Sequence, residues 1–313
     1  MSDTQASPGG IVVEGVRRAF GDVHAVRDVS LTAHPGAVTA LIGPNGSGKT
    51  TLMLMLASLL KPDAGRILIA GFDPSEDSAA VRARIGWMPD VLGSWATLTV
   101  RDTLVTTGRL YRMDAARSAA RASELLDLVG LTAFAGQATR VLSRGQKQRL
   151  SLARALVHDP EVLLLDEPAS GLDPRARVDL RHLVRRLASE GKTVLISSHV
   201  LAELDELADD AVYLEAGVTA SAERVARTRS TARPWRIKAV EGDDPRATLL
   251  RLGVAEADIV ADRSEFIVPL ASEEAAAALL AGLVAAGVRV SAFAPAVGDL
   301  EHTFLDLDST GTI

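Results

Sequence analysis

The sequence of 313 residues contains no cysteine, which excludes disulfide bonds, zinc–thiolate sites and thiol nucleophiles. It also lacks a basic excess, because 40 Asp and Glu outnumber 34 Lys and Arg and give a net charge of −6. That balance argues against a general nucleic-acid-binding protein. With 47% hydrophobic and 24% charged residues, the chain has the composition of a soluble globular protein and is long enough for two domains.

Long apolar segments are missing as well. No run reaches the roughly 20 residues of a membrane-spanning helix, and the nearest, residues 275–288, is short and interrupted by Gly282 and Gly287. Residues 1–10 are polar, contain proline and glycine, and lack the basic and apolar regions of a signal peptide, so we expect a disordered tail there. Any work at a membrane is therefore expected to depend on another chain.

The strongest motif, GPNGSGKTT, occupies residues 43–51 between a predicted buried strand and a predicted buried helix, the context of a phosphate-binding P-loop. Glycines let the backbone curl around a phosphate, and N–H groups at the helix N-terminus attract its charge. The alternative is a tight turn with an exposed lysine. Lys49 is expected to reach the β- and γ-phosphates, and the Thr50 hydroxyl to ligate Mg²⁺. The other predicted nucleotide contacts of this segment are Gly43, Asn45, Gly46, Ser47, Gly48 and Thr51.

Two acids follow the apolar strand predicted at residues 162–166. A strand end beside a P-loop is where a carboxylate that organises Mg²⁺ belongs. Asp166 is therefore predicted to hold the metal, and Glu167 to polarise the attacking water as a general base. The alternative is an acidic turn that merely closes a strand.

Ser143 begins a predicted helix that is rich in Arg and Lys. It is a good N-cap, yet a helix N-terminus with a serine hydroxyl and the Gly145 N–H can also bind a γ-phosphate. Because the chain already has a P-loop for its own phosphates, this second helix end indicates a second nucleotide, presented by a partner subunit.

In this order, the motifs resemble those of the nucleotide-binding subunits of ABC transporters. The Walker A, signature, Walker B, D-loop and switch-histidine motifs correspond to residues 43–51, 142–146, 162–166, 170–173 and His199. The likeness extends over about residues 10–220. A weaker likeness at residues 299–307 is to the ends of ATPases that serve bacterial drug, antibiotic and polysaccharide exporters.

The resemblance implies ATP and Mg²⁺ as ligands and a head-to-tail dimer, expected to be a homodimer. Each ATP would lie between the P-loop of one subunit and Ser143, Gly145 and Gln146 of the other. His199 would contact the γ-phosphate, although a histidine at a strand end can also be satisfied by the backbone. Asp173 would cross the dimer interface, or cap a helix, or both. Phe20 would stack on adenine, or belong to the core.

Two positions depart from the family pattern. Asp90 stands where the family usually has glutamine, and an ionised carboxylate only accepts hydrogen bonds. It could still ligate Mg²⁺ and is assigned to the metal set, but it puts in doubt how residues 90–97 report the nucleotide state to a membrane partner. Arg144 stands where glycine is commoner, and its side chain can point to solvent or toward a phosphate.

Alternating apolar strands and helices predict an α/β ATPase domain at residues 11–227 with a mostly parallel core sheet. The resemblance adds an antiparallel β subdomain and an α-helical subdomain. Residues 228–234 are expected to be a linker. The predicted order β-α-β-β-α-β over residues 235–313 suggests a small ferredoxin-like α+β accessory domain.

We therefore expect an ATP-hydrolysing subunit that powers a membrane transporter, an exporter, through ATP-driven dimerisation. It would sit on the cytoplasmic face of the membrane under a separately encoded permease and bind no nucleic acid. The alternative is a soluble ABC-type ATPase with a regulatory, nucleic-acid or ribosome-related role. Such relatives usually carry two cassettes or a long coiled-coil insertion, and the sequence has one set of motifs without such an insertion.

Overall fold

The computed structural model describes residues 10–91, 93, 95–229, 232–262 and 265–310, so the expected N-terminal tail lies outside the described residues except for Gly10. The chain divides into two compact units, one up to Ala220 and one from Ser221 onward. Within the described ranges, no helix combines the length and the hydropathy that a membrane span requires.

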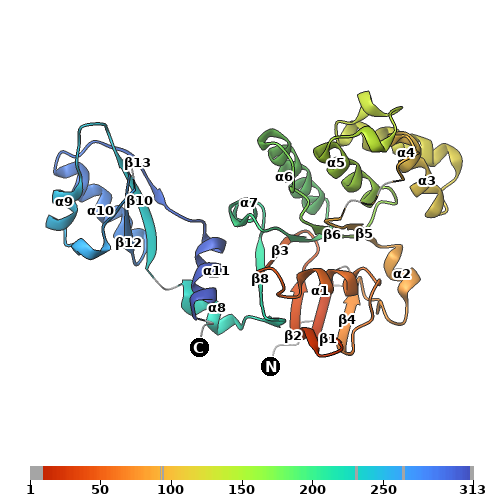
Figure 1. The fold of residues 1–313 in the computed structure, drawn as a ribbon, viewed down its shortest axis with the longest axis horizontal. Coiled ribbons are helices and arrows are strands. Elements are labelled where there is room, and N and C mark those ends of the chain that lie inside the picture. The colour runs from red at the N-terminus through yellow and green to blue at the C-terminus, as the bar shows by residue number, and fades with distance from the viewer. Residues whose placement is uncertain (1–9, 92, 94, 230–231, 263–264, 311–313) are drawn as a thin grey trace. The chain divides into compact units, whose positions relative to one another are not determined.

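A sheet of nine strands forms the centre of the first unit (Figure 1), in the order β4-β1-β2-β9-β8-β3-β7-β6-β5. Its parallel part comprises β8 (Asp210–Glu215), β3 (Val38–Ile42), β7 (Thr193–Ser197), β6 (Val162–Asp166) and β5 (Ile85–Met88). Its antiparallel part comprises β4 (Ala64–Ile69), β1 (Ile11–Phe20) and β2 (Val23–Ala33), and the short β9 (Val218–Thr219) joins the two parts. The expected parallel core sheet and antiparallel β subdomain are thus confirmed.

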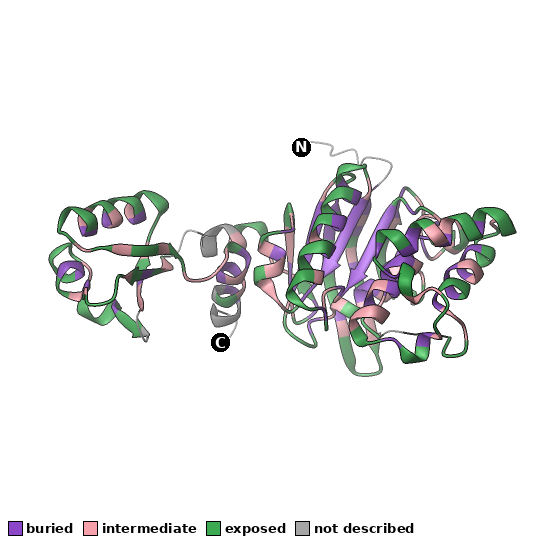
Figure 2. Cartoon of the chain, turned by 90° about the horizontal axis from the view of Figure 1, so that it is seen from above, coloured by how far each residue is buried: buried purple, intermediate pink, exposed green. Residues whose placement is uncertain are grey.

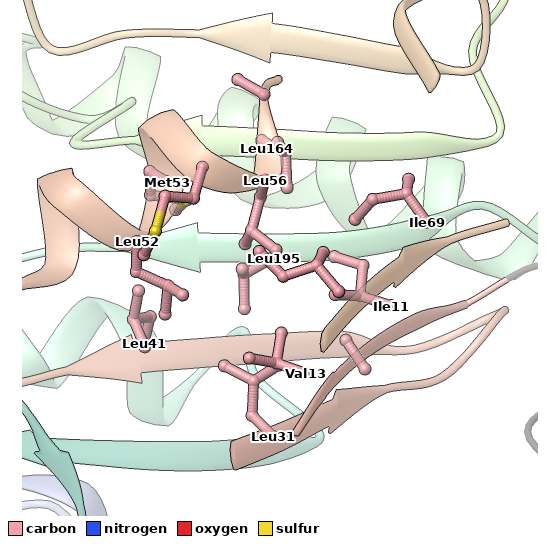
Figure 3. Close-up of a cluster of buried hydrophobic side chains, with 14 of the residues drawn as sticks. Ile11, Val13, Leu31, Leu41, Leu52, Met53, Leu56, Ile69, Leu164 and Leu195 are labelled. Atoms are coloured by element: carbon pink, nitrogen blue, oxygen red, sulfur yellow. The ribbon is translucent and has the colours of Figure 1, made fainter. Parts of the chain in front are cut away.

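The strands β3, β6 and β7 are buried at every position, as Figure 2 shows for the centre of this unit. Strands covered on both faces need continuous apolar runs, which explains the sequence pattern. The side chains that meet in this core (Figure 3) include Leu52, Met53 and Leu56 of α1, Leu164 of β6, Leu195 of β7, and Ile11 and Val13 of β1. The core therefore fixes the ends of β3, β6 and β7 relative to the start of α1.

The helices of the first unit connect or cover these strands. They are α1 (Lys49–Leu56), α2 (Ser78–Arg82), α3 (Val100–Leu110), α4 (Ala115–Leu128), α5 (Arg144–Ala155), α6 (Pro174–Ser189) and α7 (Leu201–Asp205), with 3₁₀ turns η1 (Thr132–Phe134) and η2 (Thr139–Val141). The helices α3, α4 and α5 pack on one another as the expected helical subdomain. Thr99 and Asp114 cap α3 and α4 through their side chains, as their residue types predict.

The second unit contains a four-stranded antiparallel sheet in the order β11-β12-β10-β13. Its elements are β10 (Arg233–Ala239), α9 (Arg246–Arg251), the 3₁₀ turn η3 (Glu256–Asp258), β11 (Val260–Asp262), β12 (Glu265–Leu270), α10 (Glu273–Ala285) and β13 (Val290–Pro295). This is the β-α-β-β-α-β order of a ferredoxin-like domain. Ile237, Leu249, Val268 and Leu283 are buried in its core.

Two further helices belong to this second unit. The helix α8 (Ala222–Arg229) packs on α11 (Asp299–Thr310), and the Arg224 guanidinium donates a hydrogen bond to the Leu307 carbonyl. The sequence placed the end of the ATPase domain at residue 227 and a linker at 228–234, whereas the two units meet between residues 220 and 221. The difference arises because the last turn of α8 and the first residues of β10 fall within the expected linker, parts of which lie outside the described residues.

Candidate nucleotide-binding site

The P-loop spans the gap between the end of β3 and the start of α1. Gly46 and Gly48 have φ angles of 82° and 101°, which favour glycine. A Cβ atom would lie 2.5 Å from the Ala25 carbonyl oxygen at Gly48, and 2.4 Å from the Leu214 carbonyl oxygen at Gly43. Packing against this neighbouring backbone therefore requires glycine here, and the turn leads directly into the N-terminus of α1, where N–H groups have no helical partner.

Lys49, the first residue of α1, closes the loop. Its Nζ donates to the Gly43 carbonyl at 2.6 Å and to the Pro44 carbonyl at 3.0 Å. Partial burial lowers the pKa of Lys49, and the nearby Glu167 and Asp166 carboxylates oppose that shift. The ammonium group is thus held over the loop, close to the two acids that follow β6.

A cleft of about 730 Å³ opens beside the P-loop. Its lining residues are Val23, His24, Ala25, Asn45, Gly46, Gly48, Lys49, Thr50, Thr51, Asp90, Arg144, Asp166, Glu167, Ser170 and His199. The structure therefore brings most of the predicted P-loop residues together with the two acids, Asp90 and the switch histidine. Ser47 is buried under the loop with 2% of its surface exposed, and its hydroxyl has no partner among the described residues.

Asp166 ends β6 with only 4% of its surface exposed. Its Oδ1 accepts a 2.6 Å hydrogen bond from the Ser197 hydroxyl of β7. Burial raises the pKa of Asp166, the Ser197 hydrogen bond counteracts this, and the charges of Glu167 and Asp90 add to the rise. A raised acid pKa beside two further carboxylates indicates a place where a cation would be stabilised.

The donor set of the cleft fits Mg²⁺, which prefers oxygen ligands: the Thr50 hydroxyl and the carboxylates of Asp166 and Asp90. Among the residues that the structure describes, no three His, Asp or Glu side chains form a metal cage of their own. At phosphate sites, Mg²⁺ takes part of its ligand set from the substrate and from water.

Glu167 has a φ angle of 52°, which L-residues rarely adopt. Its N–H lies 3.2 Å from the Ser197 carbonyl and hydroxyl oxygens, and its Oε2 is 2.6 Å from Nδ1 of the exposed His199. Uncommon backbone conformations of this kind persist only where neighbours impose them, and they concentrate at functional sites. The carboxylate of Glu167 and the imidazole of His199 thus form one unit at the mouth of the cleft.

The signature residues Ser143, Gly145 and Gln146 do not line the cleft of their own chain. Ser143 caps α5 in a capping box: its hydroxyl accepts from the Gln146 N–H at 3.3 Å, and its own N–H donates to Gln146 Oε1 at 2.8 Å. The expected N-cap role is confirmed, and the phosphate role, which requires a second subunit, stays a prediction.

Asp173 caps α6, as its position before Pro174 predicts: its Oδ1 accepts from the Ala176 N–H at 2.9 Å, and this bond lowers the pKa of Asp173. Phe20 is 48% exposed at the end of β1 and pairs with Val23, which lines the cleft. The Arg18 guanidinium lies 4.8 Å from the centre of its ring. The core alternative for Phe20 does not fit this exposure, and adenine stacking stays a prediction.

The sequence did not predict two residues that support the acids. The Ser197 hydroxyl binds the carboxylate of Asp166, and the Gln148 side chain binds the backbone carbonyl of Glu167. Ser197 ends β7 next to Asp166, and buried Gln148 donates from α5 to the Glu167 carbonyl at 2.8 Å. Ser197 lies two residues before His199, so the end of β7 could have suggested it. No pattern in the sequence indicates the contact that Gln148 makes.

Comparisons with known proteins agree with this geometry. Residues 26–170 match the family described as ABC transporter. The chain is 36% identical over 309 residues to the daunorubicin resistance ATP-binding protein DrrA3 of Streptomyces coeruleorubidus, with 95% of each chain covered. It is 38% identical to the Nod factor export ATP-binding protein I of Bradyrhizobium diazoefficiens, over 65% of this chain and 66% of that protein.

Solved structures of ATP-binding cassettes are also similar to this chain. The dimeric structure of a post-hydrolysis state of the ATP-binding cassette MJ0796 bound to ADP and Pi aligns with a TM-score of 0.63 and 26% identity. The alignment covers 67% of this chain and 97% of that chain. The family match at residues 26–170 lies within the first unit, which holds the cleft.

Proposed function

This chain belongs to the ATP-binding proteins of ABC transporters, and we propose that two copies of it hydrolyse ATP at a shared interface to drive export through a separate membrane subunit. The chain binds ATP and is an ATPase that powers a membrane transporter. One observation carries the proposed arrangement: each chain has both a P-loop cleft and a signature helix end, but Ser143 and Gly145 do not line that chain's own cleft.

In the proposed mechanism, the backbone of Gly43 to Thr51 and the N-terminus of α1 surround the β- and γ-phosphates of ATP. Lys49 already lies over this loop and would turn its ammonium group from the Gly43 and Pro44 carbonyls to the phosphate oxygens. Little covalent work is left to the protein, because phosphoryl transfer depends mostly on positioning and charge stabilisation.

Thr50, Asp166 and Asp90 are the residues that we propose to hold Mg²⁺. When bound, the ion neutralises charge on the β- and γ-phosphate oxygens. Ser197 orients Asp166 through its 2.6 Å hydrogen bond and so fixes the carboxylate that faces the cleft.

Glu167 accepts the proton of the attacking water in this scheme. His199 binds Glu167 Oε2 through Nδ1, so its opposite ring nitrogen, Nε2, can contact the γ-phosphate. The partner subunit completes the site with Ser143, Gly145 and Gln146 at the N-terminus of its α5, and Asp173 would lie at the same interface. ATP then joins the two subunits, and hydrolysis releases them.

The membrane subunit needs a surface that changes with the nucleotide. Exposed apolar side chains occur within residues 90–97, at Val91 (82% exposed) and Trp95 (41%), and at the end of α3, at Leu110 (69%) and Tyr111 (39%). Arg154 lies 5.4 Å from the ring centre of Trp95, and Tyr111 stacks on His158 at 3.7 Å. We assign the permease contact to these side chains, since exposed apolar groups of this kind mark protein interfaces. The proposal includes that the chain works at the cytoplasmic face of the membrane, bound to this permease.

Export is proposed from the relatives, which are named for daunorubicin resistance and for Nod factor export.

The shared site is tested by mixing two inactive variants. Lys49→Ala disables the P-loop, and Gly145→Asp places a carboxylate where the partner's γ-phosphate would lie. A Cβ atom at Gly145 has only ordinary contacts at 3.5 Å, so this variant should fold.

Each variant alone should hydrolyse ATP at background rate. A mixture should recover activity, because a mixed dimer contains one intact P-loop facing one intact signature helix. A mixture that stays as inactive as its components would contradict the shared site. The permease contact is tested by co-purification of a membrane protein with this chain. Trp95→Glu should abolish this co-purification, whereas Leu128→Glu, which changes another exposed apolar residue, should not.

A further inference from the structure

The first turn of α5 contacts its own chain as well as offering its N-terminus to a partner. Arg144 follows the capping residue Ser143, and its Nη2 donates to the Ser170 hydroxyl at 2.7 Å. The stem of Arg144 lies on Gly171, because a Cβ atom there would be 2.6 Å from the Arg144 Cδ and 2.9 Å from its Cγ. Arg144 also lines the nucleotide cleft of its own chain, beside Glu167 and His199. Its side chain is therefore directed to its own catalytic loop.

A second contact joins the same helix to the same loop. Gln148 lies one turn after Arg144 on α5, so the two side chains share a helix face. It is only 2% exposed, and its Nε2 donates to the Glu167 carbonyl at 2.8 Å. The Ser170 N–H donates to that same carbonyl at 3.1 Å. The turn from Glu167 to Ser170, which joins β6 to α6 near α5 (Figure 1), is thus bound to α5 at both of its ends.

Glu167 is the residue of this turn that most needs support. Its φ of 52° is unfavourable for an L-residue and persists only where the surroundings impose it. Removing one of the hydrogen bonds to the turn should let it relax toward a commoner backbone conformation. The carboxylate would then leave the position set by His199.

We propose that Arg144 and Gln148 are positioning residues, which bind the Glu167–Ser170 turn to α5 of the same chain and so orient the general base. This inference rests on the proposed function, since it takes the partner's nucleotide to lie at the N-terminus of α5. Each α5 then connects the γ-phosphate of one site with the general base of the other. Closure of the dimer on one ATP thereby orders the catalytic loop of the second site.

The first test is steady-state kinetics of Arg144→Ala. The loss of one charge-assisted hydrogen bond should lower kcat about tenfold, while the KM for ATP and the melting temperature stay unchanged. Ser170→Ala should give a similar loss, and the double variant no more than either single one, because both remove the same contact. Arg144→Lys, which keeps a donor, should recover part of kcat. The control is Arg140→Ala, an exposed arginine one turn before α5.

Mixed dimers decide whether Arg144 serves its own site or the partner's. In the first mixed dimer, Arg144→Ala chains pair with Glu167→Gln chains. Its one competent site uses Glu167 of the Arg144→Ala chain, so this site lacks its own Arg144 and keeps the partner's. When wild-type chains pair with chains carrying both substitutions, the competent site keeps its own Arg144 and loses only the partner's. Both are compared with dimers of wild-type and Glu167→Gln chains.

We expect the first mixed dimer to be about tenfold slower than the reference and the second to match it. The reverse result would show that Arg144 acts on the partner's nucleotide and would overturn the inference, as would equal rates in both. A fall in ATP affinity or melting temperature that accounts for the loss of kcat would also overturn it. A reference dimer of wild-type and Glu167→Gln chains that has no activity, together with failure of the Lys49→Ala and Gly145→Asp mixture, would refute the shared site itself.

Discussion

The two units of this chain place their polar groups differently. In the first unit, Asp166 and Ser197 are buried at adjacent strand ends, and Glu167 adopts an unfavourable backbone conformation. In the second unit, charged pairs such as Arg236–Glu265 and Arg289–Asp243 remain at the surface over an apolar core. Burial of a charge lowers stability unless a ligand or partner compensates. The comparison therefore locates the ATPase chemistry in the first unit, where the carboxylates of Asp166 and Glu167 line the nucleotide cleft.

The largest expected effect is at the general base. Glu167→Gln should lower kcat by roughly 10²–10⁴-fold, the usual contribution of a positioned base, while ATP still binds. The matched substitution in the second unit is Glu265→Gln, which removes a surface ion pair and should leave kcat unchanged. ATPase assays and sizing chromatography with ATP and Mg²⁺ check both, and Glu167→Gln should accumulate as a dimer. Turnover like that of the wild type would remove Glu167 from this role.

The next largest effect is expected from substitutions that create a cavity in the core of each unit. Leu164 and Leu249 are both fully buried, in β6 and α9. Substitution by alanine should lower the free energy of unfolding of the respective unit by about 2–5 kcal/mol. We expect two unfolding transitions in calorimetry, with Leu164→Ala lowering one and also the ATPase activity, and Leu249→Ala lowering only the other. A single transition shifted equally by both variants would show that the units unfold together.

A smaller effect, on ATP affinity, is expected from substitution of Lys49. Lys49→Ala should weaken ATP binding roughly 100-fold, since about 2.7 kcal/mol is expected from a charge-assisted contact with phosphate. The control in the second unit is Lys238→Ala, an exposed lysine on β10. Titration with a fluorescent ATP analogue measures both affinities. Equal affinity of Lys49→Ala and the wild type would show that the P-loop lysine does not hold phosphate.

The nucleotide site was predictable from the sequence because its chemistry is local. A strand, a glycine-rich turn and a helix start at Lys49 follow one another within a few residues, and Asp166–Glu167 end a recognisable apolar strand. The supports of the site were not predictable in the same way. Arg144 and Ser170 are 26 residues apart, and Gln148 and Glu167 are 19 apart, so only the tertiary fold brings each pair together.

The second unit shows the same limit at the level of whole elements. The order of its strands and helices was predicted, because short runs rich in apolar and β-branched residues alternate with helical segments along the sequence. The packing of α8 on α11 was not, since it joins two segments that lie on either side of the entire ferredoxin-like domain. A linker was expected where α8 ends, because the composition there is polar and the helix α11, on which α8 packs, comes from the far end of the chain.

The smallest expected difference between the units is in their response to acid. Burial lowers the pKa of His158 from 6.5 to about 4, where its ring stacks on Tyr111 and its Nε2 lies 3.0 Å from the Ile85 carbonyl oxygen. In the second unit, hydrogen bonds from Arg289 lower the pKa of Asp243 from 3.8 to about 2. Both groups therefore bind protons more weakly in the folded than in the unfolded state, so each unit loses stability as the pH falls.

The pH ranges over which His158 and Asp243 affect stability differ, so acid should destabilise the two units at different pH values. Between pH 6.5 and about 4 the unfolded His158 binds a proton that the folded ring does not, so the first transition should lose about 1–2 kcal/mol after allowance for solvent screening of a half-buried ring. In the second unit, Asp243 responds between pH 3.8 and about 2, and Glu274, whose pKa is lowered by a hydrogen bond with Ser272, responds only below its ordinary value of 4.5. Urea unfolding across this range tests the order: His158→Gln should flatten the first response and Asp243→Asn the second, with the exposed His34→Gln as control. If the second transition were the first to weaken on acidification, the assignment of these two groups would be wrong.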